Sequence, residues 1–305
     1  MSAKAIALKS NHIRSTGGDK VFNIVVSILM VIFALVAIYP LYYTIIASIS
    51  NPAYITSGQV VLLPKGLTTV AYKALFEEKE IWIGYRNSLI YVFSFTLLSL
   101  AVTLPTAYAL SRSYLPFGTG LFIIFTFTMY FTGGTIPTYL MINTLGLVDS
   151  PWVLILPHGV SAFNMVICRN YFNDNIPESL YESARIDGAN LFQYFFRFVV
   201  PLSKPIISVL ALYFSIAKWN EYLNPMIYIQ SRSKQTLQVL VRDITANLDN
   251  GMAETMDPET VSELQQRKQL LKFAVVIVTA LPLMLLYPLV QRYLISGMMV
   301  GAVKE

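Results

Sequence analysis

Residues 182–201, which read ESARIDGANLFQYFFRFVVP, are the part of the chain best suited to do chemistry. Carboxylates, arginines and aromatics surround a single glycine there. Glu182 and Arg185 stand three residues apart, so a helix would place them one turn from each other. This pattern predicts an amphipathic helix-turn-helix that presents charge to the aqueous phase on one short, stiff element.

The flanking residues predict where those helices begin and end. Pro177 suits the first turn of a helix, and Glu178 complements the positive end of that helix. An apolar stripe follows at helical spacing: Pro177, Leu180, Tyr181 and Ala184. Gly188 can end the helix in a left-handed conformation, and Asn190 can cap a second helix over residues 191–198. Pro201 is then expected to open the next element.

The rest of the chain is strongly apolar, with 55% hydrophobic and only 13% charged residues among 305. A soluble domain carries about twice that charged fraction. A helix needs about 20 mostly apolar residues to cross a bilayer. Charge-free runs of that kind predict spans at residues 21–49, 88–110, 121–142, 152–168 and 273–290. A sixth span, at residues 201–222, carries Lys204 and Lys218. The predicted fold is therefore an all-α integral membrane protein with six transmembrane helices.

Between the spans we expect solvated segments. Residues 1–20 form a basic tail, residues 50–86 form the first external loop, and residues 173–201 form an internal loop. The longest loop covers residues 223–270, and residues 297–305 form the C-terminal tail. The first apolar run is too long for a signal-peptide core and is expected to stay as an anchor. If both termini are inside, the two sides of the membrane carry equal numbers of basic residues. The three basic residues within residues 1–18 nevertheless favour an internal N-terminus.

Several classes of function lack their usual signatures. The chain has two histidines, no HExxH motif and no Gly-Lys pair, so no zinc-protease site and no Walker A loop are expected. His158 is expected to be a packed polar residue within a span. Basic residues do not gather in a patch with aromatics, so nucleic acid is not an expected partner. We therefore expect neither catalytic nor metal-binding residues. The alternative is an integral membrane enzyme or a channel.

Four stretches resemble the carbohydrate-uptake permeases of ATP-binding-cassette (ABC) importers, of the maltose (MalG/LplC-like) type. ESARIDGANLFQYFFRFVVP resembles their EAA loop, and Glu182, Ala184, Gly188 and Pro201 fall on its pattern. AYALSR (residues 107–112), WNEYLNP (219–225) and QRYLISGMMVGAVK (291–304) look like further parts of these permeases. GGTIPTYLMINTLGLVDS (133–150) is closest to the subgroup that takes up oligosaccharides containing uronic acids. The resemblance covers the chain from about residue 20 onward.

The resemblance implies a type I importer fold in which residues 21–296 form the permease domain. It implies a coupling helix that docks on a separate ATPase, with contacts at these positions: Glu182, Ser183, Ala184, Arg185, Asp187, Gly188 and Pro201. Without the resemblance, an amphipathic helix resting on lipid would explain the same pattern. The implied partners are a second, homologous permease, two ATPase subunits that bind ATP-Mg, a periplasmic or lipid-anchored sugar-binding protein, and membrane lipid. The implied location is the bacterial cytoplasmic (inner) membrane, with both termini cytoplasmic.

Two further sets of residues are expected to have functional contacts. The C-terminal tail is implied to reach the ATPase through Gly297, Gly301 and Lys304, although a frayed terminus is the simpler interpretation. Lys218 and Glu221 are spaced for an ion pair. A translocation pathway is predicted to be lined by these residues: Lys218, Trp219, Asn220, Glu221, Tyr130 and Tyr139. The alternatives are that Lys218 extends to the membrane boundary, Trp219 is an interface anchor, and the two tyrosines only pack.

Overall fold

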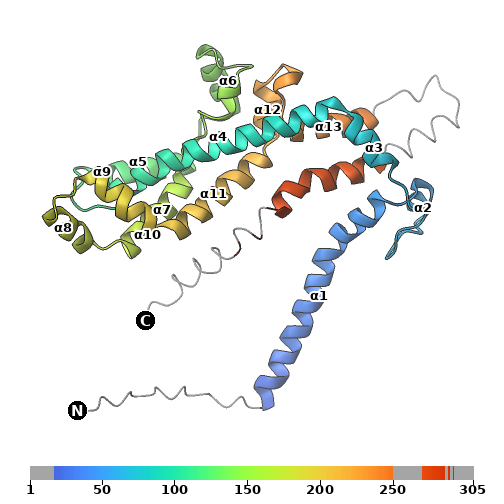
Figure 1. Ribbon diagram of the computed structural model, residues 1–305, viewed down its shortest axis with the longest axis horizontal. Coiled ribbons are helices and arrows are strands. Elements are labelled where there is room, and N and C mark those ends of the chain that lie inside the picture. The colour runs from blue at the N-terminus through green and yellow to red at the C-terminus, as the bar shows by residue number, and fades with distance from the viewer. Residues whose placement is uncertain (1–16, 250–269, 286–287, 289–290, 292–305) are drawn as a thin grey trace. The chain divides into compact units, whose positions relative to one another are not determined.

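The computed structural model describes residues 17–249, 270–285, 288 and 291. The chain divides into two compact units, residues 1–68 and 69–305, and each is described by itself. Every regular element among the described residues is helical (Figure 1). The predicted all-α membrane fold is therefore confirmed.

The first unit consists of α1 (Gly17–Ser48), α2 (Pro52–Thr56) and the segment that follows them. α1 is long and apolar enough to cross a membrane. It buries almost none of its apolar side chains before Ile46, so lipid or a partner must cover them. Asn51 caps α2 by accepting a hydrogen bond from the Ala53 amide. The Thr68 amide donates to the Ile49 carbonyl oxygen, which closes the segment back onto the end of α1.

The second unit contains the remaining elements. In chain order they are α3 (Val70–Glu77), α4 (Lys79–Leu110), α5 (Gly118–Tyr130), α6 (Thr135–Thr144), η1 (Pro151–Leu154), α7 (Ala162–Asn175), α8 (Glu178–Ile186), α9 (Leu191–Tyr194), the π-helical turn η2 (Phe195–Val199), α10 (Val200–Leu202), α11 (Lys204–Trp219), α12 (Leu223–Tyr228), η3 (Arg232–Lys234), α13 (Leu237–Asp249) and a helix at Leu270–Leu285.

α4 is the axis of this unit, with α7 and α11 packed beside it (Figure 1). The main apolar core forms where these three helices meet α8, α9 and η2. Buried residues that α4, α7, α11 and α9 contribute to it include Phe95, Phe172, Leu210 and Tyr194, respectively. A second core joins the other half of α4 to α6, η1 and α12 through Tyr91, Ile142, Leu154 and Tyr228. The two halves of α4 therefore pack against different groups of elements.

Among the described residues, α1 and α4 are long enough to cross a membrane, and two bent pairs bring the number to four if each pair is one span. The pairs are α5 with α6, bent by 113°, and α9–α10 with α11, bent by 79°. The helix Leu270–Leu285 is shorter. The six-span count stays a prediction.

Several helices have other bounds than the predicted spans. α4 begins at Lys79, before the predicted span at 88–110, and its polar first turns have partners: Glu80 contacts Arg232, and Asn87 donates to the Ser233 and Gln235 carbonyls. The span predicted at 121–142 is not continuous, because Gly134, with φ of 85°, separates α5 from α6.

The span predicted at residues 152–168 is replaced by η1, a turn and α7. Ser161 caps α7, which therefore starts at Ala162, and His158 lies exposed in the preceding turn rather than within a helix. α7 continues past Arg169 because that charge is accommodated. Its Nε donates to the Leu110 carbonyl oxygen at 2.8 Å, and its guanidinium lies over the Phe122 ring.

The predicted helix at 201–222 and the loop at 223–270 also differ from the structure. Pro201 lies inside α10, and α11 begins at Lys204 after the break at Ser203. Residues 223–249 are largely helical rather than a solvated loop. α13 packs against the first half of α4, where the Leu237 amide donates to the Ser88 hydroxyl. The prediction counted only the acidic and basic residues of this segment. That count does not distinguish an amphipathic helix such as α13 from a solvated loop.

Candidate functional site

The segment predicted to couple is α8, a nine-residue helix at the end of the second unit where α4 finishes (Figure 1). Its inner face packs on the main core through the half-buried Leu180 and Tyr181 and the buried Ala184. Three of the four predicted stripe residues therefore pack as expected, whereas Pro177 is exposed at the N-cap position. The helix is fixed to the core along one side and free on the other.

The outward positions of this segment carry the predicted charges. Glu182, Ser183, Arg185 and Asp187 are all exposed. Ile186 exposes 87% of its surface between them. An exposed apolar side chain with charged neighbours resembles a protein–protein interface, which has an apolar centre and a polar rim.

The connection between α7 and α8 is held by Arg112, which sequence reasoning had treated only as part of a motif. Arg112 is buried and donates to the Phe172 and Ile176 carbonyl oxygens at 3.0 and 2.9 Å. A guanidinium satisfies these carbonyls and complements the negative end of α7. Beside it, the Glu178 carboxylate accepts hydrogen bonds from the hydroxyl and amide of Ser113, which lower the pKa of that carboxyl. Both contacts tie the start of α8 to the end of α4.

The other end of α8 is closed by a turn at Gly188, whose φ is 82°. Asn190 then forms a capping box with Gln193, because each side chain accepts from the other's backbone amide. The predicted stop and cap are thus present. α9 is shorter than predicted, since the chain passes into the π-helical turn η2 and, through α10, reaches α11. Between α8 and α11 the chain is helical from Leu191 to Leu202, and the turn at Gly188 and the break at Ser203 interrupt the path on either side.

α11 ends at the predicted ion pair. The Lys218 amine donates to the Glu221 carboxylate at 2.5 Å, and the Lys218 side chain exposes only 4% of its surface. The Asn224 amide donates to the other Glu221 oxygen, also at 2.5 Å, and the Lys218 amine lies over the Phe95 ring. Lys218 therefore does not extend to a membrane boundary, because its charge is neutralised inside the helix bundle.

The neighbouring predicted residues divide into packed and exposed positions. Trp219 is buried, and its indole Nε1 donates to the Thr279 carbonyl oxygen at 3.1 Å, so it does not anchor the chain in lipid. Asn220 is exposed and caps α11 through the Ile216 carbonyl. Tyr139 is half-buried and stacks on Tyr228. Tyr130 is exposed at the end of α5, on the other side of the 113° bend.

Asp149 is a functional candidate that sequence reasoning missed. It accepts hydrogen bonds from the Gln230 and Ser231 amides and the Ser231 hydroxyl. The Lys234 amine pairs with the same carboxylate at 3.0 Å. Together these contacts hold the pKa of Asp149 well below its usual range. A signal was present in the sequence, since Asp149 carries the only formal charge between Ser113 and Cys168.

The remaining predicted positions, Gly297, Gly301 and Lys304, lie outside the described residues. In the part of the chain that is described, no three His, Cys, Asp or Glu side chains gather where a metal ion could be held. The described residues therefore combine an exposed charged helix, α8, with a buried ion pair at the far end of α11.

Comparisons with known proteins place this arrangement in a family. Residues 81–300 match the family described as "Binding-protein-dependent transport system inner membrane component". The chain is 36% identical to the polygalacturonan/rhamnogalacturonan transport system permease protein YtcP of Bacillus subtilis (strain 168), over 94% of this chain and 99% of that protein. It is 31% identical to Protein LplC of the same organism, over 95% and 97% of the two chains.

A solved structure agrees as well. A bacterial ABC transporter involved in the import of the acidic polysaccharide alginate superposes with a TM-score of 0.82 at 32% identity, covering 92% of this chain and 98% of that chain. The family resemblance predicted from the motifs is confirmed. The chain belongs to the family of binding-protein-dependent transport system inner membrane components, and it is a non-catalytic permease subunit with the type I ABC importer fold.

Proposed function

We propose that this permease forms half of the translocation pathway of an ATP-driven importer that takes up acidic oligosaccharides. The names of two similar proteins support an acidic sugar, since one concerns polygalacturonan and rhamnogalacturonan and the other alginate. The observation that carries the mechanism is the short chain path from the exposed α8, through the turn at Gly188 and the elements α9, η2 and α10, to α11, which ends at the ion pair.

In this proposal α8 is the coupling helix. Glu182, Ser183, Arg185 and Asp187 meet the ATPase, while Ala184 and the turn at Gly188 keep the helix attached to its own core. A short helix fixed at both ends moves as one body. Its displacement would pass through η2 and α10, with Pro201 inside α10, to the start of α11. Straight helical rise places Lys204 and Trp219 about 22 Å apart, so α11 spans most of a bilayer core.

The assembly we propose contains a second, homologous permease, two ATPase subunits and an external sugar-binding protein. ATP-Mg would bind to the ATPase subunits. The complex would lie in the bacterial inner membrane with both termini of this chain cytoplasmic, placing residues 1–20, 173–201 and 297–305 on the side of the ATPase. Deleting residues 297–305 is then expected to weaken copurification of the ATPase, and an intact active complex would argue against a contact there.

At the other end of α11, we propose that Lys218, Asn220 and Glu221 border the pathway. Lys218 is neutralised by Glu221, which is half-buried and also receives Asn224. A sugar carboxylate approaching this pair would compete with Glu221 for the amine. Trp219 and Tyr139 would support this region by packing, and Tyr130 would contact solute from the end of α5.

The test is reconstituted transport. The complete importer in proteoliposomes, supplied with its binding protein and ATP, is expected to accumulate oligogalacturonides or oligoalginate faster than neutral maltooligosaccharides of the same length. Uptake restricted to neutral sugars would contradict the acidic substrate class. ATP-independent flux of either sugar would contradict the importer mechanism and favour a channel.

A further inference from the structure

Two adjoining cavities lie where α4 ends and the connection 111–117 begins. One encloses about 330 Å³ and is lined mainly by polar residues, including Arg112, Arg169 and Glu178. The other encloses about 220 Å³ and is almost entirely apolar. Leu115 lines both. Ligand sites in proteins have volumes of roughly 300–1,000 Å³, so the two chambers together are large enough for a bound molecule.

The polar chamber has an excess of positive charge. Arg112 is fixed there by its bonds to the Phe172 and Ile176 carbonyls and to the Ser111 hydroxyl. Arg169 uses only its Nε, which donates to Leu110, and within the described chain no acceptor is bonded to its two terminal nitrogens. Guanidinium groups with free paired donors suit a phosphate or a carboxylate.

One carboxylate, that of Glu178, also lines this chamber. It is already engaged by the hydroxyl of Ser113 at 2.7 Å and by the Ser113 amide, and it forms no ion pair within 4.0 Å with either arginine among the described residues. The first turn of α5 supplies Gly118 and Thr119 to the same lining, with the positive end of that helix. Two guanidiniums against one carboxylate leave a net positive chamber.

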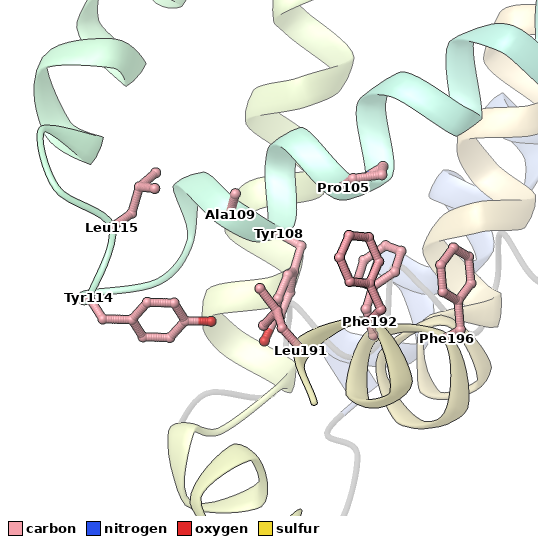
Figure 2. A pocket seen from close by; sticks show the side chains of 9 residues that line it. Pro105, Tyr108, Ala109, Tyr114, Leu115, Leu191, Phe192 and Phe196 are labelled. Atoms are coloured by element: carbon pink, nitrogen blue, oxygen red, sulfur yellow. The ribbon is translucent and has the colours of Figure 1, made fainter. Parts of the chain in front are cut away.

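The apolar chamber is formed by α4 on one side and by α9 and η2 on the other. Figure 2 shows Pro105 and Ala109 on α4 facing the rings of Phe192 and Phe196 across it. These two phenylalanines are 76% and 63% exposed. α4 is 32 residues long, or roughly 47 Å, and therefore exceeds the ~30 Å hydrocarbon core. The end of such a helix, with aromatics exposed beside it, belongs at the level of lipid headgroups.

We propose that the paired cavities hold one anionic phospholipid, with its phosphate at Arg169 and Arg112 and part of an acyl chain against Ala109 and Phe192. Basic pockets between membrane helices near one face of the bilayer are known to bind anionic headgroups. A free phosphate would fill only the polar chamber, and a neutral apolar molecule only the other. The polar and apolar chambers adjoin at Leu115, and a lipid has both a phosphate and an acyl chain to fill them. Bound there, the lipid joins the end of α4 to the segment that follows α8.

The experiment measures lipid retained by the purified, fully assembled transporter. The complex is placed in phosphatidylcholine nanodiscs with a small fraction of phosphatidylglycerol, released into mild detergent, and weighed intact by mass spectrometry. The wild-type complex is expected to retain one phosphatidylglycerol per copy of this chain. Arg169→Gln removes the free guanidinium, and Ala109→Leu fills the apolar chamber. Each is expected to reduce retention about tenfold, Arg169→Gln because charge-assisted hydrogen bonds to the phosphate are lost and Ala109→Leu because the larger side chain excludes the acyl chain.

Matched variants separate this site from general attraction to an acidic membrane. Arg197→Gln removes an exposed positive charge of the same segment outside both cavities and should retain lipid like the wild type. Arg169→Lys keeps the charge and should restore part of the retention. Assembly of every variant with its partner subunits is checked by gel filtration, which excludes misfolding as the cause of lipid loss.

Three results would overturn the proposal. Retention by Arg169→Gln equal to the wild type would show that the arginine holds no headgroup. Loss in Arg169→Gln without loss in Ala109→Leu, together with displacement by inorganic phosphate, would identify a free anion. A wild-type complex that retains no phosphatidylglycerol, while Arg169→Gln fails to assemble, would assign the chamber to a carboxylate of a partner subunit.

Discussion

Glu182 is the single residue on which the coupling proposal depends most directly. It is exposed on α8, one turn from Arg185, on a helix whose opposite face is buried. If it meets a basic group of the ATPase, Glu182→Lys brings two like charges together in a partly desolvated contact. ATP-dependent uptake should then fall at least about tenfold while the complex still inserts and assembles.

The matched control is Glu77→Lys, the same charge reversal at an exposed position of α3. Uptake by that variant should stay near the wild-type rate. Normal uptake by the Glu182→Lys transporter would rule out a contact at this residue and leave α8 as a helix that rests on lipid.

Asp149 allows a prediction with a defined pH dependence. It lies between α6 and η1, outside the membrane-spanning helices, and its bonds to Ser231 and Lys234 lower its pKa in the folded protein. A lowered pKa contributes stability above the unfolded value of about 3.9, and that contribution is lost as pH falls toward the folded value. Asp149→Asn should therefore lower the thermal-unfolding midpoint at pH 7, by an amount that shrinks below about pH 4.

The measurement compares the midpoints of wild type and Asp149→Asn at neutral and acid pH, with Glu77→Gln, at an exposed carboxylate on α3, as the control. A difference that is the same at pH 7 and below pH 4 would show that the charge of Asp149 contributes nothing. Sequence reasoning overlooked this residue because a lone aspartate in a short connection resembles a turn residue. Its partners lie about eighty positions away in the chain.

At the scale of elements, Gly188 tests whether α8 needs its sharp stop. Its φ is 82°, and a Cβ built there meets nothing within 4 Å, so a substitution is penalised by backbone conformation alone. Gly188→Ala should cost about 1–2 kcal/mol locally, whereas asparagine tolerates the left-handed region better. Stimulation of ATP hydrolysis by loaded binding protein should therefore be highest in the wild type, lower in Gly188→Asn and lowest in Gly188→Ala. Equal stimulation in all three would show that the turn does not matter for coupling.

The element boundaries show what local pattern can and cannot predict. The stop at Gly188 and the cap at Asn190 were predictable, because glycine and asparagine act on the backbone within a few residues. The start of α4 was not predictable, because its charged first turns are paired with Arg232, about 150 residues away. The 79° bend at Ser203 was likewise not predictable, because a count of charges along the chain carries no information on the direction of a helix.

At the scale of the whole molecule, α4 packs against both regions to which we assign a function. The proposed coupling helix α8, with α9 and η2, packs near its last turns, and α13 and the ion pair pack along its earlier ones. α11 runs beside it and joins the same two regions by continuous backbone. In the coupling that we propose, a displacement of α8 relative to α4 would move α11 along α4. The buried ion pair lies at the far end of that movement.

The last prediction separates a structural role of that pair from a role in transport. Glu221→Gln leaves the Lys218 amine buried without its counter-charge, which typically costs about 3–5 kcal/mol. Adding Lys218→Met removes the orphaned charge and should restore most of the stability, because a buried pair can be replaced by apolar groups at little cost. The thermal midpoint should thus fall in the single variant and recover in the double variant.

Transport by the double variant should not recover together with its thermal midpoint. If the pair contacts the sugar or gates the pathway, the double variant remains stable while the ratio of stimulated to basal ATP hydrolysis, and uptake with it, stays low. Thr96→Val is the control, since it removes the 3.1 Å hydroxyl contact between Thr96 on α4 and Ser215 on α11 without changing charge. The Thr96→Val transporter should take up sugar at the wild-type rate. Recovery of both stability and stimulation in the double variant would show that Lys218 and Glu221 only hold α11 in place.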